Sequence, residues 1–264
     1  MRLSAAFDMV RVANVRDENP TTKTFVFDYH LGAKPGQFVM VWIPKVNEKP
    51  MSVGGDDGKT FSLTVASVGP FSQAFQKLKV GDRVGVRGPY GHAYQLKGKR
   101  VAMVGGGFGS APLLFLAEHA KKKGMHVDFI QGARSKDKLI LEKDIQKLGC
   151  HLHIATNDGS KGKNGLVTDV LSELLKANRY DGVYACGPEL MMQAVGEICE
   201  KHETYCEISV ERYMKCGFGV CGQCDCGGFL TCVEGTVADY KKIKNNPDFG
   251  KIHRDASGQK HSFL

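Results

Sequence analysis

The stretch Arg100-Val-Ala-Met-Val-Gly105-Gly-Gly107-Phe-Gly109-Ser-Ala-Pro112 decides how the middle of the chain folds. Its apolar start predicts a short strand over 100–104, and residues 113–123 predict a helix. A strand, a glycine-rich turn and a helix in this order allow the backbone to approach a pyrophosphate on the helix N-terminus. We therefore expect Gly105, Gly107 and Gly109 to bind a dinucleotide, with a purely structural turn as the alternative. Pro112 departs from the G-x-G-x-x-G pattern but suits the first turn of a helix.

Strands and helices alternate after this turn. The sequence predicts further strands over 127–131, 151–156 and 182–186, and helices over 141–148, 167–175 and 189–202. Such alternation is typical of a parallel sheet covered by helices on both faces, with ligands at the carboxyl ends of the strands. Cys186 and Gly187 follow one such end and are candidates to contact the bound ligand. At another end Arg134 and Lys136 are suited to a 2′-phosphate, so the residues leave both NAD and NADP open.

The residues before this region have the signature of an antiparallel β domain. Short runs rich in Val, Phe and Thr, separated by turn residues, predict strands over 8–15, 22–28, 38–42, 51–54, 60–66 and 83–87. Six short strands at this spacing indicate a closed barrel. A helix is expected over 72–78, with Ser72 capping its N-terminus.

Two stretches of the β domain are suited to a flavin. Lys49, Pro50, Met51 and Ser52 bring a cation and a hydroxyl to the start of a strand, which suits a phosphate and the edge of an isoalloxazine ring. Gly69 and Ser72 open the helix, whose free N–H groups attract a pyrophosphate. Taken alone, each stretch is more often just an ordinary loop charge or turn than part of a flavin site.

Five of the nine cysteines lie in one loop, Cys216-Gly-Phe-Gly-Val-Cys221-Gly-Gln-Cys224-Asp-Cys226-Gly-Gly-Phe-Leu-Thr-Cys232. The first three have the C-x4-C-x2-C spacing of plant-type [2Fe–2S] loops, which a more distant fourth thiolate completes. Its glycines allow turns with positive φ and bring amide N–H groups close to the sulfurs. We expect Cys216, Cys221, Cys224 and Cys232 to ligate a cluster. Cys226 is left either beside the ligands or as a competitor for one ligand position.

Zinc and disulfides are the alternatives for this loop. Structural zinc sites favour two C-x2-C knuckles, and the loop has one. The first residues, Met1-Arg-Leu-Ser-Ala-Ala-Phe-Asp8, show no apolar signal core, so we expect a reducing cytoplasmic location without disulfides. The histidines His92, His119, His126, His151 and His153 show no metal-binding spacing of interest.

Length and charge limit the function classes. A chain of 264 residues with 42% hydrophobic residues has room for two domains and a small appendage. No apolar run approaches the roughly 20 residues needed to span a bilayer. The formal net charge of +8 comes from Lys and Arg spread along the chain, so we expect neither nucleic acid nor membrane as a partner.

Taken together, these motifs resemble the ferredoxin-NADP reductase superfamily. Within it the chain is most similar to the iron–sulfur electron-transfer subunits of NAD-dependent dihydroorotate dehydrogenases. The resemblance extends to about Gly235 and rests on Lys49-Pro-Met-Ser52, Val86-Arg-Gly-Pro-Tyr-Gly91, Gly105 to Pro112, Ala185-Cys-Gly-Pro188 and the cysteine loop after Glu211-Arg-Tyr-Met-Lys215. One departure is Lys49, where the family's flavin motif usually has Arg, which makes planar bidentate contacts.

The resemblance implies an α+β multidomain protein. Residues 1–96 would form an FAD-binding β-barrel, 97–205 an NAD(P)-binding α/β domain with the nicotinamide near Cys186, and 206–264 a [2Fe–2S] module with a C-terminal tail. The tail from Thr236 is polar and contains glycine, so we expect it either to pack over the cluster or the partner or to be disordered. The implied partner is an FMN-containing catalytic subunit that oxidises dihydroorotate in pyrimidine biosynthesis, in a heterotetramer. Electrons would pass from FMN through the cluster to FAD and NAD. No side chain is expected to be catalytic, because flavin and nicotinamide supply that chemistry; Cys186 is expected to position or pack.

Two other functions remain open at this stage. One is a related reductase subunit of a hydrogenase, a sulfide dehydrogenase or a ferredoxin:NADPH oxidoreductase. The other, from a different class, is a zinc-stabilised binding module on a scaffold without cofactors.

Overall fold

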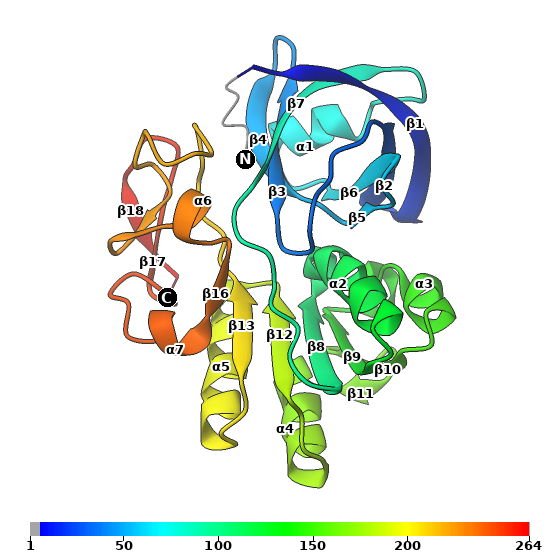
Figure 1. Ribbon diagram of the computed structural model, residues 1–264, viewed down its shortest axis with the longest axis vertical. Helices are drawn as coiled ribbons and strands as arrows, with labels where there is room; N and C mark the ends of the chain where they lie inside the picture. Colours follow the sequence, from blue (N-terminus) through cyan, green and yellow to red (C-terminus); the bar gives the residue numbers. More distant parts are fainter. Residues whose placement is uncertain (1–5, 264) are drawn as a thin grey trace.

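The computed structural model describes residues 6–263. Most of the N-terminal segment on which the absence of a signal core was argued, residues 1–5, therefore lies outside the described part of the chain. Two sheets form the body of the molecule, and the C-terminal segment lies along one side of both (Figure 1). Within residues 6–263 no helix is long and apolar enough to cross a membrane.

The first sheet is antiparallel and has the strand order β4-β3-β7-β1-β2-β6-β5. Its elements are β1 (Asp8–Asn19), β2 (Thr22–Asp28), β3 (Phe38–Ile43), β4 (Asn47–Ser52), β5 (Gly55–Asp56), β6 (Thr60–Ala66), α1 (Pro70–Phe75) and β7 (Arg83–Tyr90). Alternating apolar residues turn inward to a core rich in Phe. Phe25 meets Phe75 edge to face with ring centroids 4.8 Å apart, and Phe27 stacks on Phe61 at 4.9 Å.

The prediction of a closed barrel is wrong. Strands β4 and β5 are the two edges of the sheet and do not pair with each other. Helix α1 contacts both β4 and β6, and its Phe71 and Phe75 fill the core on this open side. The helix also begins earlier than expected, because Gly69 is its N-cap and Ser72 lies in its first turn.

The second sheet has the order β11-β10-β9-β8-β12-β13-β16, and all its pairs are parallel except β13 with β16. Its elements up to residue 209 are β8 (Arg100–Gly106), η1 (Gly107–Gly109), α2 (Ser110–Lys122), β9 (His126–Ala133), η2 (Lys136–Lys138), α3 (Glu142–Lys147), β10 (His151–Thr156), β11 (Lys163–Asn164), α4 (Val167–Ala177), β12 (Gly182–Cys186), α5 (Glu189–Lys201) and β13 (Cys206–Ser209). Helices α2 and α3 cover one face, and α4 and α5 cover the other. The predicted parallel sheet covered on both faces is confirmed.

The C-terminal segment is folded along its described length, so of the two alternatives for the tail the disordered one is wrong. It contains β14 (Asp225–Cys226), β15 (Phe229–Leu230), α6 (Thr231–Glu234), β16 (Val237–Asp239), α7 (Tyr240–Ile243), β17 (Ile252–Arg254) and β18 (Lys260–Ser262). Strand β16 extends the second sheet, and Tyr240, Ile243 and Phe249 are buried against α5 and its neighbours. The β17–β18 hairpin lies beside the cysteine loop, where Arg254 pairs with Asp225 at 3.0 Å (Figure 1).

A buried ion pair joins this segment to the second sheet. Arg212 forms a bidentate pair with Glu189, the first residue of α5, and the two side chains are only 2% and 5% exposed. Arg212 Nη2 also donates to Cys226 Sγ at 2.9 Å. The amide of Gly250, in the tail, donates to Glu189 Oε1 at 2.6 Å. The carboxylate of Glu189 therefore connects α5, the cysteine segment and the tail.

Replacing Arg212 by Met should lower the free energy of unfolding by about 3–5 kcal/mol, because the change leaves the Glu189 carboxylate buried without its cation. Urea unfolding of the cofactor-loaded protein measures this loss. The matched control is Arg11→Met, since Arg11 pairs with Asp28 at 2.8 Å while both side chains are more than half exposed. We expect the control to cost less than about 1 kcal/mol. Equal losses in the two variants would contradict the assigned role of the buried pair.

Candidate functional site

The glycine turn and the Cys186-Gly187 turn lie against each other. Strands β8 and β12 are neighbours, with Gly105 paired to Cys186. A Cβ added to Gly109 would lie 2.3 Å from the carbonyl oxygen of Cys186, and one added to Gly187 would lie 2.9 Å from Gly106 Cα. Both contacts are too short for a side chain. The sequence-predicted residues of the dinucleotide site are thus brought together at the carboxyl edge of the second sheet.

Helix α2 begins at this edge with Ser110, whose hydroxyl group is unpaired within residues 6–263. Ser110 is completely buried, and its hydroxyl has no hydrogen-bond partner among the described residues. A Cβ on Gly105 would lie 2.6 Å from that hydroxyl oxygen. Pro112 lies in the first turn of α2, as the sequence predicts. An unsatisfied hydroxyl beside a glycine turn and a helix N-terminus is suited to a phosphate oxygen.

Cys186 is held as a neutral thiol. Burial raises the pKa of Cys186 to about 12; the nearby Glu211 carboxylate contributes to the rise and the Ser209 hydroxyl opposes it. The carbonyl of the preceding Ala185 accepts a hydrogen bond from Tyr94 at 3.0 Å. A protonated thiol is a poor nucleophile, so the site favours a positioning or packing role for Cys186 over a covalent one.

The predicted flavin residues lie on an open strand. Lys49, Pro50, Met51 and Ser52 belong to β4, an edge strand whose residues are half-buried or exposed. Lys49 Nζ lies 4.1 Å from the centre of the Tyr213 ring, so β4 faces the segment that leads into the cysteine loop. Lys49 therefore connects this edge strand to the segment that precedes the cysteines.

Gly69 and Ser72 form the start of α1. Ser72 Oγ accepts from the amides of Val68 and Gly69 at 2.8 and 2.9 Å, and it donates to the Gly69 carbonyl. Its hydroxyl is therefore used within the turn itself. A Cβ on Gly69 would meet nothing within 4 Å, which leaves open space beside this turn.

The four predicted ligand cysteines come together as two pairs. The thiol of Cys216 contacts that of Cys221, and the thiol of Cys224 contacts that of Cys232. The backbone amide of Gly219 donates to Cys232 Sγ at 3.2 Å, and the amide of Cys232 donates to Cys224 Sγ at 3.4 Å. Gly217, Gly219 and Gly222 all have positive φ, as the sequence predicts. The loop therefore presents four sulfurs, two by two, with amides directed at them.

The surroundings favour ionised sulfur at two of these positions. Burial raises the pKa of Cys216, but amide hydrogen bonds from Cys221 and Phe218 outweigh it and bring the pKa to about 7. The hydrogen bond from Cys232 lowers the pKa of Cys224 to about 6, and the same contact raises that of Cys232. A metal that binds these sulfurs as thiolates displaces the protons that the close thiols share.

Cys226 points away from the other four. It is completely buried in the core beside α4 and α5, whereas Cys224 and Cys232 lie in a separate core with Phe38, Met40 and Tyr90. Its sulfur accepts from Arg212, and burial raises the pKa of Cys226 to about 11. The two residues Cys224 and Cys226 thus face opposite sides of the segment, and Cys226 does not compete for the four-sulfur site.

Arg87 fixes the cysteine loop to the antiparallel sheet. It is 7% exposed on β7, and its Nε donates to Glu48 at 2.6 Å. Its Nη2 donates to the Lys215 carbonyl at 3.0 Å, and its Nη1 donates to the carbonyl of Cys216. The guanidinium also lies 5.6 Å from the centre of the Phe218 ring. Each of the three guanidinium nitrogens of Arg87 therefore has a partner, and two of these partners are backbone carbonyls at the start of the loop.

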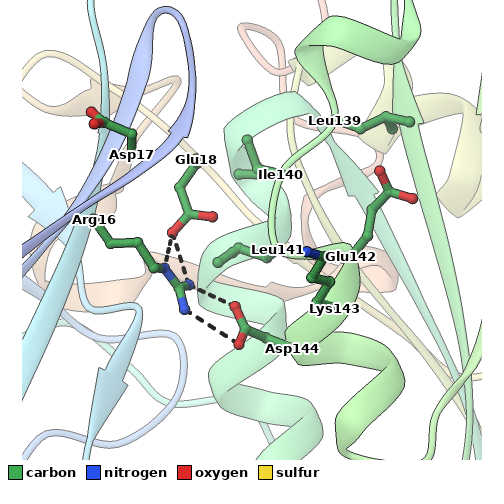
Figure 2. A pocket seen from close by; sticks show the side chains of 9 residues that line it. All are labelled: Arg16, Asp17, Glu18, Leu139, Ile140, Leu141, Glu142, Lys143 and Asp144. Atoms are coloured by element: carbon green, nitrogen blue, oxygen red, sulfur yellow. Dashed lines mark hydrogen bonds and ion pairs between the residues drawn. The ribbon is translucent and has the colours of Figure 1, made fainter.

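A cavity of about 400 Å³ lies elsewhere, between the end of β1 and residues 139–144 (Figure 2). Arg16 reaches across it to Asp144 at 2.6 Å and also contacts Glu18 at 2.8 Å. None of the predicted cofactor residues lines this cavity, and its one lining arginine, Arg16, is paired with Glu18 and Asp144. We interpret it as a junction between the two sheets rather than a cofactor site.

Sequence reasoning missed two residues of the site. Arg87 and Glu211 both belong to stretches that carried the resemblance, but neither stretch gave them a role. An arginine in an otherwise apolar strand was the available signal for Arg87. For Glu211 no local signal exists, because only the fold places its carboxylate near Cys186.

Comparisons with known proteins found relatives that match the chain over most of its length. Residues 103–197 match the family described as the oxidoreductase NAD-binding domain. A protein of Methanocaldococcus jannaschii called probable dihydroorotate dehydrogenase B (NAD(+)), electron transfer subunit is 42% identical over 252 residues, 95% of this chain and 96% of its own length. A protein of the same description from Methanopyrus kandleri is 43% identical over 227 residues, 86% of each chain.

Solved structures share the fold. A structure reported for an NADH-dependent reduced ferredoxin-NADP oxidoreductase in a study of electron bifurcation superposes with a TM-score of 0.80 at 27% identity, covering 89% of each chain. The cytochrome b5 reductase domain of Ulva prolifera nitrate reductase superposes with a TM-score of 0.63 at 19% identity, covering 75% of this chain and 93% of that domain.

The thiol of Cys186 should resist alkylation. Because its pKa is about 12 where an ordinary thiol has 9.0, its thiolate fraction near neutral pH falls about a thousandfold. We expect iodoacetamide to label it about a thousandfold more slowly in the folded protein than in the urea-unfolded chain, as measured by peptide mass spectrometry. Comparable rates in the two states would contradict the neutral, buried thiol.

Proposed function

The chain belongs to the family of dihydroorotate dehydrogenase B electron-transfer subunits, and from this we propose that it passes electrons between NAD and an FMN-containing partner that oxidises dihydroorotate. FAD and a [2Fe–2S] cluster would be the carriers, in pyrimidine biosynthesis. The observation that carries the proposal is the convergence of four thiols in two pairs beside the first, antiparallel sheet.

The nicotinamide dinucleotide would bind at the carboxyl edge of the second sheet. Gly105, Gly107 and Gly109 would give its pyrophosphate access to the start of α2, where the Ser110 hydroxyl is unpaired. Cys186 and Gly187 would lie next to the nicotinamide ring. The neutral thiol of Cys186 adds no charge there. The carboxylate of Glu211 lies close enough to help raise the pKa of that thiol.

FAD would lie along the edge of the first sheet. Lys49, Pro50, Met51 and Ser52 offer one cation and one exposed hydroxyl on an edge strand, and Gly69 with Ser72 offers a turn with open space beside it. When bound, FAD exchanges hydride with nicotinamide and single electrons with an iron–sulfur centre. The chain's own part is to hold the ring between β4 and the second sheet and to exclude water there.

The residues of the cysteine loop fit a [2Fe–2S] cluster. Such a cluster needs four thiolates, two for each iron, and the loop offers the pairs Cys216 with Cys221 and Cys224 with Cys232. Amides of Gly219, Cys221 and Cys232 donate to sulfurs, which stabilises negative charge there. We accordingly propose the division into a flavin domain (1–96), a nicotinamide domain (97–205) and a cluster module (206–264).

Two serine substitutions separate a ligand cysteine from a structural one. Protein purified without oxygen should be yellow-brown and give a paramagnetic signal after reduction. Cys224→Ser should lose most of the iron and that signal, whereas Cys226→Ser should keep both, because Cys226 faces Arg212. Iron analysis, visible absorption and electron paramagnetic resonance measure the difference. A cluster that is lost from Cys226→Ser and kept in Cys224→Ser would refute the ligand set, and a colourless wild type containing zinc would refute the cluster.

The partner would dock where the cysteine loop reaches the surface. Cys221 is exposed, and two large apolar side chains surround it: Val220 is 77% exposed and Val233 is 44% exposed. Val233 is in turn close to Gly219, where it would meet an added Cβ at 2.6 Å. An apolar surface over the cysteines suits a stable subunit interface. We propose that two copies of each subunit assemble into a heterotetramer.

Val220→Lys should weaken binding of the dihydroorotate-oxidising subunit by at least about tenfold, because a charge replaces an apolar contact at the interface. Val80→Lys is the matched control, since Val80 is 64% exposed and belongs to the turn before β7. Copurification and analytical ultracentrifugation of the two subunits measure binding. If Val220→Lys binds as the wild type does, the docking surface lies elsewhere.

A related reductase is the second candidate, because the ferredoxin-NADP oxidoreductase structure covers 89% of this chain at 27% identity. Arg134, exposed at the end of β9, is suited to the 2′-phosphate of NADP. An assay of NADH against NADPH, with dihydroorotate and the partner present, separates the two functions: preference for NADPH and no response to dihydroorotate would favour the reductase.

A further inference from the structure

Three histidines and a buried aspartate gather at the amino edge of the second sheet. His126 and Asp128 lie on β9, and His151 and His153 lie on the neighbouring parallel strand β10. This edge is opposite to the one that carries Gly105 and Cys186, because all these strands run in the same direction. The cluster therefore lies outside every site described above.

The register of the two strands creates this cluster. Residues two apart on a strand face the same side, so His126 with Asp128, and His151 with His153, project together. Asp128 pairs directly with His151. The rings of His126 and His151 are 4.6 Å apart between centroids. The spacing of the histidines along the chain does not indicate this arrangement, because it depends on the register of two strands.

Asp128 is the centre of the cluster. It is 2% exposed, and its Oδ2 accepts from Tyr180 Oη at 2.8 Å and from Arg100 Nη2 at 3.3 Å. The same oxygen lies 3.0 Å from His126 Nε2. Its Oδ1 contacts His153 Nε2 at 2.9 Å. Four polar side chains from three strands and a loop therefore surround the carboxylate of Asp128.

We propose that His126, Asp128 and His151 form a binding site for a divalent transition metal of the zinc type. One ligand atom from each of the three lies within 4.8 Å of the others. Two imidazole nitrogens and one carboxylate oxygen form a common zinc ligand set, and water fills the fourth position. His153 and Tyr180 hold the carboxylate from either side, which is the role of the hydrogen-bonding partners around metal ligands.

The proposed metal site is open to solvent, and one cation, Arg100, lies beside it. His151 is exposed and the side chain of His126 is 38% exposed, so an ion can enter from solvent. Arg100 is the cation that competes with the metal for Asp128. Its contact of 3.3 Å exceeds the usual hydrogen-bond range, and its ring-stacked position 5.0 Å from the centre of Tyr180 holds it to one side.

Titration of Zn²⁺ into the cluster-loaded protein tests the site, because the cysteine ligands are then occupied. Isothermal calorimetry should show one binding event, and His151→Ala should weaken it by at least about tenfold. His151 is exposed, so this variant keeps the fold. His202→Ala, which removes an exposed histidine at the end of α5, should bind as the wild type does.

Co²⁺ provides a second readout that distinguishes this site from cysteine. Bound Co²⁺ should show visible bands of nitrogen and oxygen ligands without thiolate-to-cobalt absorption, and His151→Ala should remove these bands. NADH oxidation should be unchanged in His151→Ala, because the site lies at the other edge of the sheet. The absence of binding in the wild type, thiolate absorption with Co²⁺, or identical binding by His151→Ala would overturn the proposal.

Discussion

The guanidinium of Arg87 is the interaction on which the placement of the cysteine loop depends. It is buried, it carries its charge at every accessible pH, and its donors are satisfied only when the carbonyls of Lys215 and Cys216 lie against β7. Withdrawal of the loop would leave a buried cation with Glu48 as its main partner. A segment with little regular structure of its own is in this way held in one place by the cost of an unpaired charge.

Arg212 performs the same task on the other side of the segment. Its pair with Glu189 is buried, and it orders Cys226 and the tail through direct hydrogen bonds. The two arginines explain why alternate cysteines diverge. Cys224 belongs to the core that Arg87 borders, and Cys226 belongs to the core that Arg212 borders.

Much of the fold could be predicted because the local sequence of many strands is enough to identify them. The strands 22–28, 60–66, 151–156 and 182–186 have the predicted bounds, since each is a run of apolar or β-branched residues between turns. Strands β13 and β16 were missed because four and three residues are too few for a pattern and form only against an existing sheet edge. Closure of the first sheet was predicted wrongly because a helix completes its core. The grouping of Asp128 with His151 depends on strand register, which local sequence does not encode.

The pair between Glu189 and Arg212 also has a mechanical consequence. Glu189 lies two residues after Gly187, and the cysteine segment continues directly from Arg212. One bidentate contact therefore connects the region proposed for hydride exchange directly to the region proposed for single-electron exchange. Tunnelling rates decay steeply as the gap between redox centres widens, so a buried contact of this kind limits changes in the distance between the two regions.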